Sequence, residues 1–379
     1  MNLKKKIGKH KVIVMAVEHY NTLGLIRSLG EKGLSPIYIA IKGKAKVAST
    51  SKYVKTCHYA DNSAQAYSIL MDNYRDENHK AFVLCIDDKT ISYMDERYDD
   101  LKNYFYFFNS GSAGRVNKYM DKLNILEVAK QCGLKTLRAY RCKNGELPGE
   151  IRYPVITKAI SPVVGGWKSD VHICNSEIEL LEAYKSIEAQ EVLVQEYIEK
   201  KNEYCLEGFS VNHGKDMLVT IASTYNYLLP NYYSPYMTVR NMDDKELHRK
   251  LNNLMKLIGF EGIYEIEFLI DQDDTLYFGE INFRNSTWSY ASTVAGMNLP
   301  ALWIESTIDG YIPEDAYVKI EKPFTAMVEP IDYGKRVDTG KITYAEWLGD
   351  FKDAKCLYYY NEEDREPYYE MMRHFDIMK

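Results

Sequence analysis

The 379-residue sequence lacks several patterns that would each indicate a class of protein. Its seven cysteines are odd in number, scattered and never spaced as CxxC, which argues against a disulfide framework and against a zinc site. No stretch is apolar for long enough to span a membrane, and the apolar run at 12–17 is too short for a secretion signal. We therefore expect a cytoplasmic protein with reduced thiols and no membrane partner.

An excess of positive charge is missing as well. The chain carries 48 lysines and arginines against 54 aspartates and glutamates, so it lacks the overall basic footprint of a nucleic-acid-binding protein. Hydrophobic residues make up 46% and charged residues 27%, which is typical of a globular protein, and the length predicts two or three domains. We expect small-molecule partners and no nucleic acid.

The N-terminal third is predicted to form an open parallel sheet, because apolar runs alternate with helical patterns. Strands are expected at 11–17, 36–41, 81–86 and 104–108, with helices at 21–32 and 63–76. The glycine fingerprint GxGxxG of dinucleotide-binding folds is absent, which disfavours an NAD site. We assign residues 1–108 to this α/β domain.

Residues 262–288 concentrate carboxylates on one face of a predicted β-hairpin. Alternation with a period of two places Glu267 on this face of the first strand, and Glu280 and Asn282 on the same face of the second. A four-residue turn at 272–275 would set Glu267 opposite Glu280. A solvated surface hairpin is the alternative, but two facing carboxylates beside an amide oxygen form a ligand set that suits Mg²⁺.

Lysines and a glycine pair occur between these two regions. Lys122 lies near the start of a predicted helix, Lys158 ends a predicted strand, and the loop that follows contains Gly165, Gly166 and Lys168. Adjacent glycines allow backbone N–H groups to approach an anion, and lysines supply positive charge for phosphate. Solvated lysines and an ordinary turn are the alternatives, and the Walker A pattern GxxxxGK[ST] is absent.

The remaining segments complete the predicted secondary structure. We expect a helix at 177–189, strands at 191–198, 205–211 and 217–223, and a helix at 245–258 that leads into the hairpin. The last part of the chain has strands near 324–328 and 356–360 and is expected to pack on the preceding lobe.

The order of these motifs resembles that of the ATP-grasp superfamily. In that family a strand ends in lysine, a glycine loop follows, a strand ends in a hinge like QEYI with a later glutamate, and a hairpin carries Glu and Glu-x-Asn. The similarity covers about residues 10–315 and implies ATP bound between two α+β lobes behind an open α/β domain. The expected fold class is therefore α/β and α+β, with an N-terminal open parallel α/β (pre-ATP-grasp) domain at 1–108, a small lobe with its linking helix at 109–195, a large lobe with the Mg site at 196–315 and a C-terminal extension at 316–379.

The resemblance also implies a role for each matching residue. ATP and Mg²⁺ are the implied cofactors, with two metal ions expected and Mn²⁺ able to replace them. By similarity, Lys122, Lys158, Gly165, Gly166 and Lys168 hold the phosphates; Gln195, Glu196, Tyr197 and Ile198 hold adenine; Glu203 holds the ribose; Glu267, Glu280 and Asn282 bind the metal; and Arg284 lies near the acyl phosphate.

The activity that the resemblance implies is ATP-dependent ligation of a carboxylate and an amine. The carboxylate attacks the γ-phosphorus of ATP, Lys158 and Arg284 offset charge on the transferring group, and an amine then displaces phosphate to give an amide. Activation of bicarbonate, and a regulator that binds ATP without turnover, are the alternatives. Whether the chain forms a homodimer is left open.

Two features depart from the family pattern. The loop at 161–169 has two glycines where biotin carboxylases have a longer run, and Glu265 stands where D-alanine ligases have an arginine. The N-terminal domain and the segment around Lys122 are more similar to D-aspartate-ligase-like and carbamoyl-phosphate-synthase-like members. The residues expected to line the acceptor pocket follow the hairpin and are Asn285, Ser286, Trp288 and Tyr290.

Overall fold

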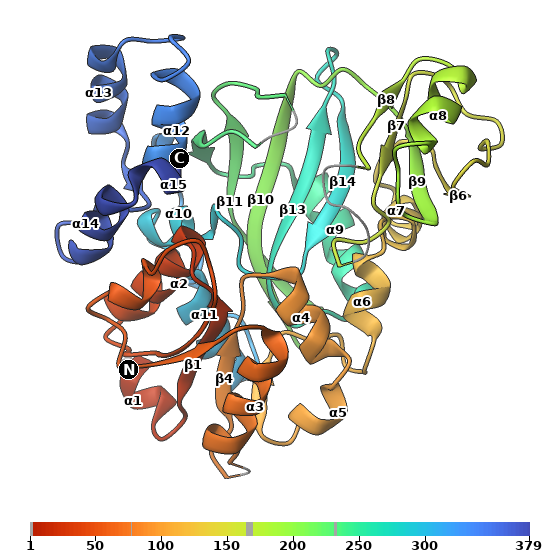
Figure 1. The fold of residues 1–379 in the computed structure, drawn as a ribbon. Helices are drawn as coiled ribbons and strands as arrows, with labels where there is room; N and C mark the ends of the chain where they lie inside the picture. Colours follow the sequence, from red (N-terminus) through yellow and green to blue (C-terminus); the bar gives the residue numbers. More distant parts are fainter. Residues whose placement is uncertain (1–2, 77, 164–169, 231–232) are drawn as a thin grey trace.

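The computed structural model describes residues 3–76, 78–163, 170–230 and 233–379. Three sheets organise this part of the chain: a parallel sheet near the N-terminus, a four-stranded antiparallel sheet and a central seven-stranded sheet (Figure 1). This arrangement confirms the expected mixture of α/β and α+β architecture. Among the helices in these ranges, none is long and apolar enough to cross a membrane.

The parallel sheet has the strand order β3–β2–β1–β4–β5. Its strands are β1 (Val12–Val17), β2 (Ile37–Ile41), β3 (Thr56–Ala60), β4 (Ala81–Leu84) and β5 (Phe105–Phe107). The helices around it are α1 (Leu3–Ile7), α2 (Tyr20–Glu31), α3 (Ser63–Tyr74), α4 (Asp88–Asp95) and α5 (Tyr98–Leu101), with the short 3₁₀ helix η1 (Ala48–Thr50). The order of strands reverses between β1 and β4. The carboxyl ends of these two strands, called the switch point below, are where open α/β sheets bind ligands.

The four-stranded sheet has the order β6–β9–β7–β8 and packs against one helix. Its elements are β6 (Ala139–Lys143), β7 (Val155–Lys158), β8 (Ile173–Cys174), α8 (Glu177–Tyr184) and β9 (Glu191–Glu196). Two helices, α6 (Arg115–Met120) and α7 (Lys122–Gln131), precede it where one was predicted. The helix breaks at Asp121, because this carboxylate caps α7 by accepting the N–H groups of Leu123 and Asn124. Lys122 therefore begins a helix.

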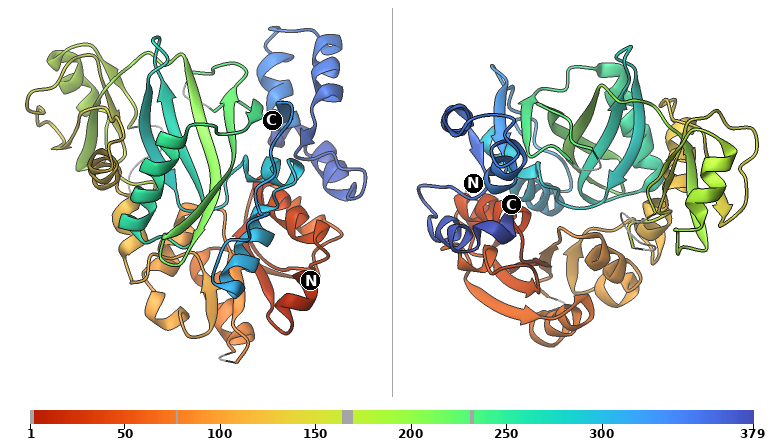
Figure 2. Two further views of the ribbon diagram at one scale, coloured as in Figure 1. Left: turned by 180° about the vertical axis from the view of Figure 1, so that it is seen from behind. Right: turned by 45° about the horizontal axis from the view of Figure 1, so that its top comes forward.

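The central sheet has the order β14–β13–β10–β11–β12–β15–β16. Its elements are β10 (Asn202–Val211), β11 (Asp216–Tyr225), β12 (Tyr236–Arg240), α9 (Lys245–Ile258), β13 (Gly262–Ile270), β14 (Leu276–Asn282), α10 (Ser289–Val294), α11 (Leu299–Asp309), β15 (Phe324–Met327) and β16 (Cys356–Leu357). Helix α9 has the predicted bounds, between the cap Asp244 and Gly259, whose φ of 74° ends it. Figure 2 shows the small sheet beside one edge of the central sheet and the C-terminal helices beside the other.

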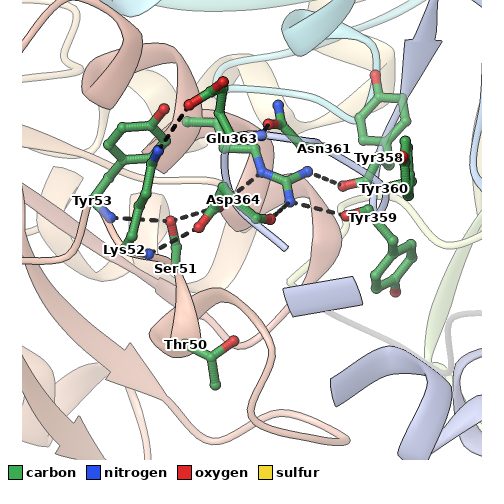
Figure 3. Close-up of polar contacts among 12 residues, drawn as sticks. Thr50, Ser51, Lys52, Tyr53, Tyr358, Tyr359, Tyr360, Asn361, Glu363 and Asp364 are labelled. Atoms are coloured by element: carbon green, nitrogen blue, oxygen red, sulfur yellow. Dashed lines mark hydrogen bonds and ion pairs between the residues drawn. The ribbon is translucent and has the colours of Figure 1, made fainter. Parts of the chain in front are cut away.

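The C-terminal segment connects two parts of the fold. Strands β15 and β16 extend the central sheet, and the segment also forms four helices that were not predicted: α12 (Glu329–Arg336), α13 (Tyr344–Asp353), α14 (Glu366–Arg373) and α15 (Phe375–Met378). Arg27 of α2 is buried against this segment, where it donates to Asp364 and to the carbonyls of Tyr358 and Tyr359. Figure 3 shows Asp364, Tyr358 and Tyr359 around this contact. The segment therefore packs on the N-terminal sheet region as well as on the central sheet.

Candidate active site

Strands β13 and β14 bring the predicted carboxylates together. Glu267 lies opposite Glu280, and Glu265 lies opposite Asn282. The Asn282 amide nitrogen Nδ2 donates to Glu265 Oε2 at 2.9 Å and to Glu267 Oε1 at 2.7 Å. Burial, and then the charges of Glu265 and Glu280, raise the pKa of Glu267 well above its usual value. A carboxyl group in these surroundings would be stabilised as an anion by a bound cation.

The turn of the hairpin differs from the prediction. Five residues, 271–275, join the strands instead of four, because Ile270 pairs with Leu276. A bulge at Gly279 adds one residue to β14 and restores the predicted pairing of the carboxylates. A Cβ atom at Gly279 would lie only 3.1 Å from the Glu267 carbonyl oxygen, so glycine suits this close approach.

Two lysines from different elements lie beside these carboxylates. Lys122, at the start of α7, pairs with Glu280, and the lysine charge lowers the pKa of that carboxyl. Lys158, at the end of β7, donates from Nζ to Gln195 Oε1 at 2.9 Å. Burial, followed by the charge of Lys122, lowers the pKa of Lys158 to about 8. A bound anion would reduce the repulsion between the two ammonium groups.

The segment expected to hold adenine, 195–198, leaves β9 beside Lys158, and its last three residues are half-buried. The Tyr197 N–H donates to the Pro154 carbonyl at 2.9 Å. Glu203, at the start of β10, pairs with Lys200. Its negative charge also acts on Lys158, where it opposes the lowering of the lysine pKa. The other predicted phosphate-binding residues, Gly165, Gly166 and Lys168, lie outside the described residues.

Arg284 connects the hairpin to the N-terminal sheet. Its Nε donates to Asp88 Oδ1 at 2.8 Å, and its Nη2 donates to Asn282 Oδ1 at 3.2 Å. Asp88 begins α4, shortly after β4, on one side of the switch point. The sequence analysis did not identify Asp88, although its place at the carboxyl end of a predicted parallel strand was a usable signal.

The carboxylate and amide oxygens at this site suit Mg²⁺ better than they suit a metal whose ligands all come from protein. Within the described ranges, no three His, Cys, Asp or Glu side chains converge into a metal cluster. Mg²⁺ usually takes one or two carboxylates and completes its octahedron with phosphate oxygens and water. Glu267 and Glu280 supply that number, whereas the amide oxygen of Asn282 faces Arg284 and would have to turn toward the ion.

The candidate site is reached from solvent. The side chains of Lys122 and Glu280 retain 20% and 33% of their exposure, so a solute can contact both. A cavity of about 170 Å³ beside β5 and another of about 510 Å³ beside α8 contain none of the site residues described above.

The family described as the ATP-binding domain of the carbamoyl-phosphate synthase L chain matches residues 121–305, which include both lysines and the hairpin. This match covers just under half of the chain and supports the ATP-grasp superfamily for the residues that carry the predicted site. The resemblance expected from the order of motifs is thereby confirmed.

Individual relatives of this ATP-grasp chain match a smaller part of it. An N5-carboxyaminoimidazole ribonucleotide synthase of Staphylococcus aureus (strain COL) is 28% identical over 177 residues, 44% of this chain and 45% of the relative. A homologous protein of Staphylococcus epidermidis (strain ATCC 12228 / FDA PCI 1200), with the same name, is 25% identical over 135 residues, 35% of this chain and 34% of the relative. The matched part therefore spans less than half the length of these curated relatives.

Solved structures are similar over most of the chain. N5-carboxyaminoimidazole synthetase from Staphylococcus aureus has a TM-score of 0.64 at 17% identity, covering 87% of this chain and 86% of that one. L-amino acid ligase from Bacillus licheniformis has a TM-score of 0.62 at 13% identity, covering 85% and 80%. Biotin carboxylase from Campylobacter jejuni has a TM-score of 0.66 at 20% identity, covering 84% and 75%. These similarities support the ATP-grasp fold.

The residues after the hairpin do not line an acceptor pocket as expected. Asn285, Ser286, Trp288 and Tyr290 are all at most 5% exposed. Asn285 donates to Asn21 Oδ1 on α2 at 2.7 Å, and Ser286 donates to Glu207 Oε1 at 2.5 Å. Burial raises the pKa of Glu207 to about 7. These polar groups join the N-terminal sheet to the central sheet of the ATP-grasp fold, so the prediction for them is wrong.

Proposed function

We propose that the chain is an ATP- and Mg²⁺-dependent ligase that activates a carboxylate as an acyl phosphate and joins it to an amine. The observation that supports this most is the meeting of opposite charges at one site. Glu267 and Glu280 project from the hairpin, and Lys122 and Lys158 approach them from two other elements. A magnesium nucleotide carries both kinds of charge that such a site would bind.

Each part of the nucleotide has a set of partners in this proposal. Lys122 and Lys158 hold the phosphates, and Glu267, Glu280 and Asn282 hold the metal. The ion supplies charge neutralisation on the phosphate oxygens when it is bound. Because the N–H groups of Glu196 and Tyr197 already donate to Arg138 and Pro154 carbonyls, adenine is assigned to the Glu196 carbonyl and the Ile198 N–H. The ribose is assigned to Glu203.

The acid would bind where Arg284 approaches the switch point. Its carboxylate would replace Asp88 as a partner of the guanidinium, which can bind two oxygens at once. One carboxylate oxygen attacks the γ-phosphorus of ATP and ADP leaves, while Lys158 and Arg284 offset charge on the transferring group. The amine then attacks the acyl carbon, phosphate leaves with the carbon–oxygen bond electrons, and the nitrogen loses a proton to give the amide.

The test is phosphate release from ATP and Mg²⁺ over a matrix of small carboxylates, amino acids and other amines. Glu280→Gln keeps the side-chain size but removes the charge that pairs with Lys122, so we expect turnover to fall at least about 100-fold. Glu246→Gln is the matched control, because Glu246 pairs with Arg249 on the exposed face of α9. Circular dichroism would show that both variants fold, and full turnover in Glu280→Gln would remove the metal assignment.

The same panel of carboxylates and amines distinguishes the ligase from the two alternative functions. Bicarbonate is a second candidate acid, favoured by the contact between Arg284 and Asn282 beside the carboxylates. ADP release that depends on bicarbonate and needs no amine would favour this activity. Tight ATP binding without ADP release for any pair would instead support a regulator and contradict the ligase.

A further inference from the structure

His19 lies at the switch point, beyond the carboxyl end of β1, and β1 pairs with the strand that precedes Asp88. It follows β1 and caps α2, whereas Asp88 follows β4 and accepts from Arg284. The backbone of His19 is extended, with φ of −158° and ψ of 156°, and its side chain is exposed. The charge of Arg284 acts on the His19 ring, so the two side chains lie near each other and a ligand of Arg284 would lie near His19 as well.

One ring nitrogen of His19 already has a hydrogen-bond partner within the protein. The Asn21 N–H donates to His19 Nδ1 at 3.2 Å, so this nitrogen is an acceptor and carries no proton. The neutral ring therefore has its proton on Nε2. Desolvation, and then the charges of Arg284 and Lys44, lower the pKa of His19 to about 4. The ring meets water at its surface, but protein surrounds it closely enough for desolvation to be the larger cause.

The orientation of the ring is fixed by a buried aromatic neighbour. The centroids of the His19 and Tyr20 rings are 4.0 Å apart with an interplanar angle of 35°. Tyr20 is 3% exposed and packs against Tyr358 and Tyr359 of the C-terminal segment. The Nε2–H is thus a donor whose direction is set before any ligand arrives.

We propose that His19 binds the activated acid, donating its Nε2–H to the carboxyl oxygen of a small carboxylate and of the acyl phosphate made from it, opposite Arg284. This inference rests on the proposed function and adds a binding residue to it. A neutral imidazole suits the role, because it stabilises negative charge on an oxygen without transferring its proton. Its low basicity makes it unsuited to be the base for the attacking amine.

Two substitutions separate this role from helix capping. In His19→Asn the side-chain oxygen can still accept the Asn21 N–H, because asparagine is a favoured cap, but no donor remains at the position of Nε2. In His19→Gln an amide N–H can reach that position, but the longer side chain caps the helix poorly. A capping role therefore predicts that His19→Gln is the more damaged variant, whereas the proposed role predicts that His19→Asn is.

The probe is acetyl phosphate, titrated calorimetrically into the full chain saturated with MgADP. We expect His19→Asn to weaken acetyl phosphate binding by at least about tenfold while the affinity for MgADP stays unchanged. His19→Gln should lose less affinity, despite a lower melting temperature. In ¹⁵N spectra at pH 7, the His19 Nε2 resonance of the wild type should show the neutral Nε2–H form and move on addition of acetyl phosphate.

Two results would overturn the inference. One is unchanged acetyl phosphate affinity in His19→Asn, which would leave His19 as a cap. The other is a wild type that binds MgADP but not acetyl phosphate, which would leave the nucleotide site intact and remove this residue's role. A wild type that fails to bind MgADP would contradict the proposed function itself, and this inference with it.

Discussion

Two arginine–aspartate pairs connect the N-terminal sheet region to the rest of the chain, and they differ in access to solvent. The side chains of Arg27 and Asp364 are 0% and 1% exposed, whereas those of Arg284 and Asp88 are 18% and 21% exposed. Arg27 donates four hydrogen bonds, of which three go to backbone carbonyls. Arg284 donates two hydrogen bonds within the described residues.

The aspartates differ in the same way. Asp364 also accepts from the Ser51 hydroxyl at 2.8 Å and from the Lys52 N–H at 2.9 Å, so both of its oxygens have protein partners (Figure 3). Asp88 lies at the switch point, where a ligand can compete for its arginine. The comparison shows that the same kind of ion pair differs in burial and in the number of donors already used. Arg27 clamps two parts of the fold, whereas Arg284 keeps donors that the proposed function assigns to a ligand.

The largest effect is expected from breaking the buried pair. Arg27→Met leaves Asp364 buried without its countercharge, which should lower the free energy of unfolding by about 3–5 kcal/mol. Urea denaturation measures this value. The control is Arg249→Met, which removes an exposed pair with Glu246 and should leave the free energy of unfolding nearly unchanged, because water screens this pair. Equal losses in the two variants would contradict the assignment of Arg27 as a clamp.

The second largest effect is expected from Arg284→Met, which tests whether this arginine serves activity where Arg27 serves stability. Arg284→Met should reduce turnover about 100- to 1,000-fold, because the proposed function requires its charge beside the acid and the transferring phosphoryl group. Its unfolding free energy should fall by less than that of Arg27→Met, since both side chains of the Arg284–Asp88 pair keep some contact with water. A loss of stability as large as that of Arg27→Met, with turnover retained, would make Arg284 a second clamp.

Local sequence patterns predicted those features whose period is regular. The apolar spacing of α9 and the alternation along β13 and β14 were sufficient to predict these three elements. The pairing of Glu267 with Glu280 was also correct, but only because the bulge at Gly279 offsets a turn that is one residue longer than expected. Strand β3 was not predicted, because it lies at the sheet edge and its partly exposed residues form no apolar run.

Contacts between distant segments could not be read from such patterns. Arg284 and Asp88 are 196 residues apart, and neither neighbourhood indicates the other. Asp364 belongs to an acid-rich stretch that resembles a solvated surface, yet it is 2% exposed. Similarly, the polar run after the hairpin suggested a pocket, whereas tertiary packing buries it against α2. Local polarity does not determine which polar groups face water.

A smaller effect, on the pH dependence of MgATP binding, is expected from the two lysines of the site. Like the two arginines, they differ in their partners. Lys122 has Glu280 as a countercharge, whereas Lys158 donates to the neutral Gln195 and has a pKa of about 8. Raising the pH from 7 to 9 removes the proton from Lys158, so MgATP affinity should fall by about three- to tenfold over this range.

MgATP binding should return a proton to part of the Lys158 side chains that are neutral in the free protein. Phosphate beside Lys158 favours its charged form, so MgATP binding at pH 8 should take up about half a proton, measured by calorimetry in buffers of different ionisation enthalpy. Lys158→Met should abolish the uptake. An uptake that persists in this variant would assign the titration to another group.

The central claim, that the hairpin carboxylates bind Mg²⁺ together with ATP, is tested most directly by ATP calorimetry with and without Mg²⁺. In the wild type, Mg²⁺ should raise ATP affinity at least about tenfold, because an ion held by Glu267 and Glu280 would offset the charge of the phosphates. In Glu280→Gln this gain should disappear, while binding of ATP without metal persists through Lys122 and Lys158. Equal gains from Mg²⁺ in the two proteins, or ATP binding that is indifferent to Mg²⁺ in the wild type, would contradict the claim.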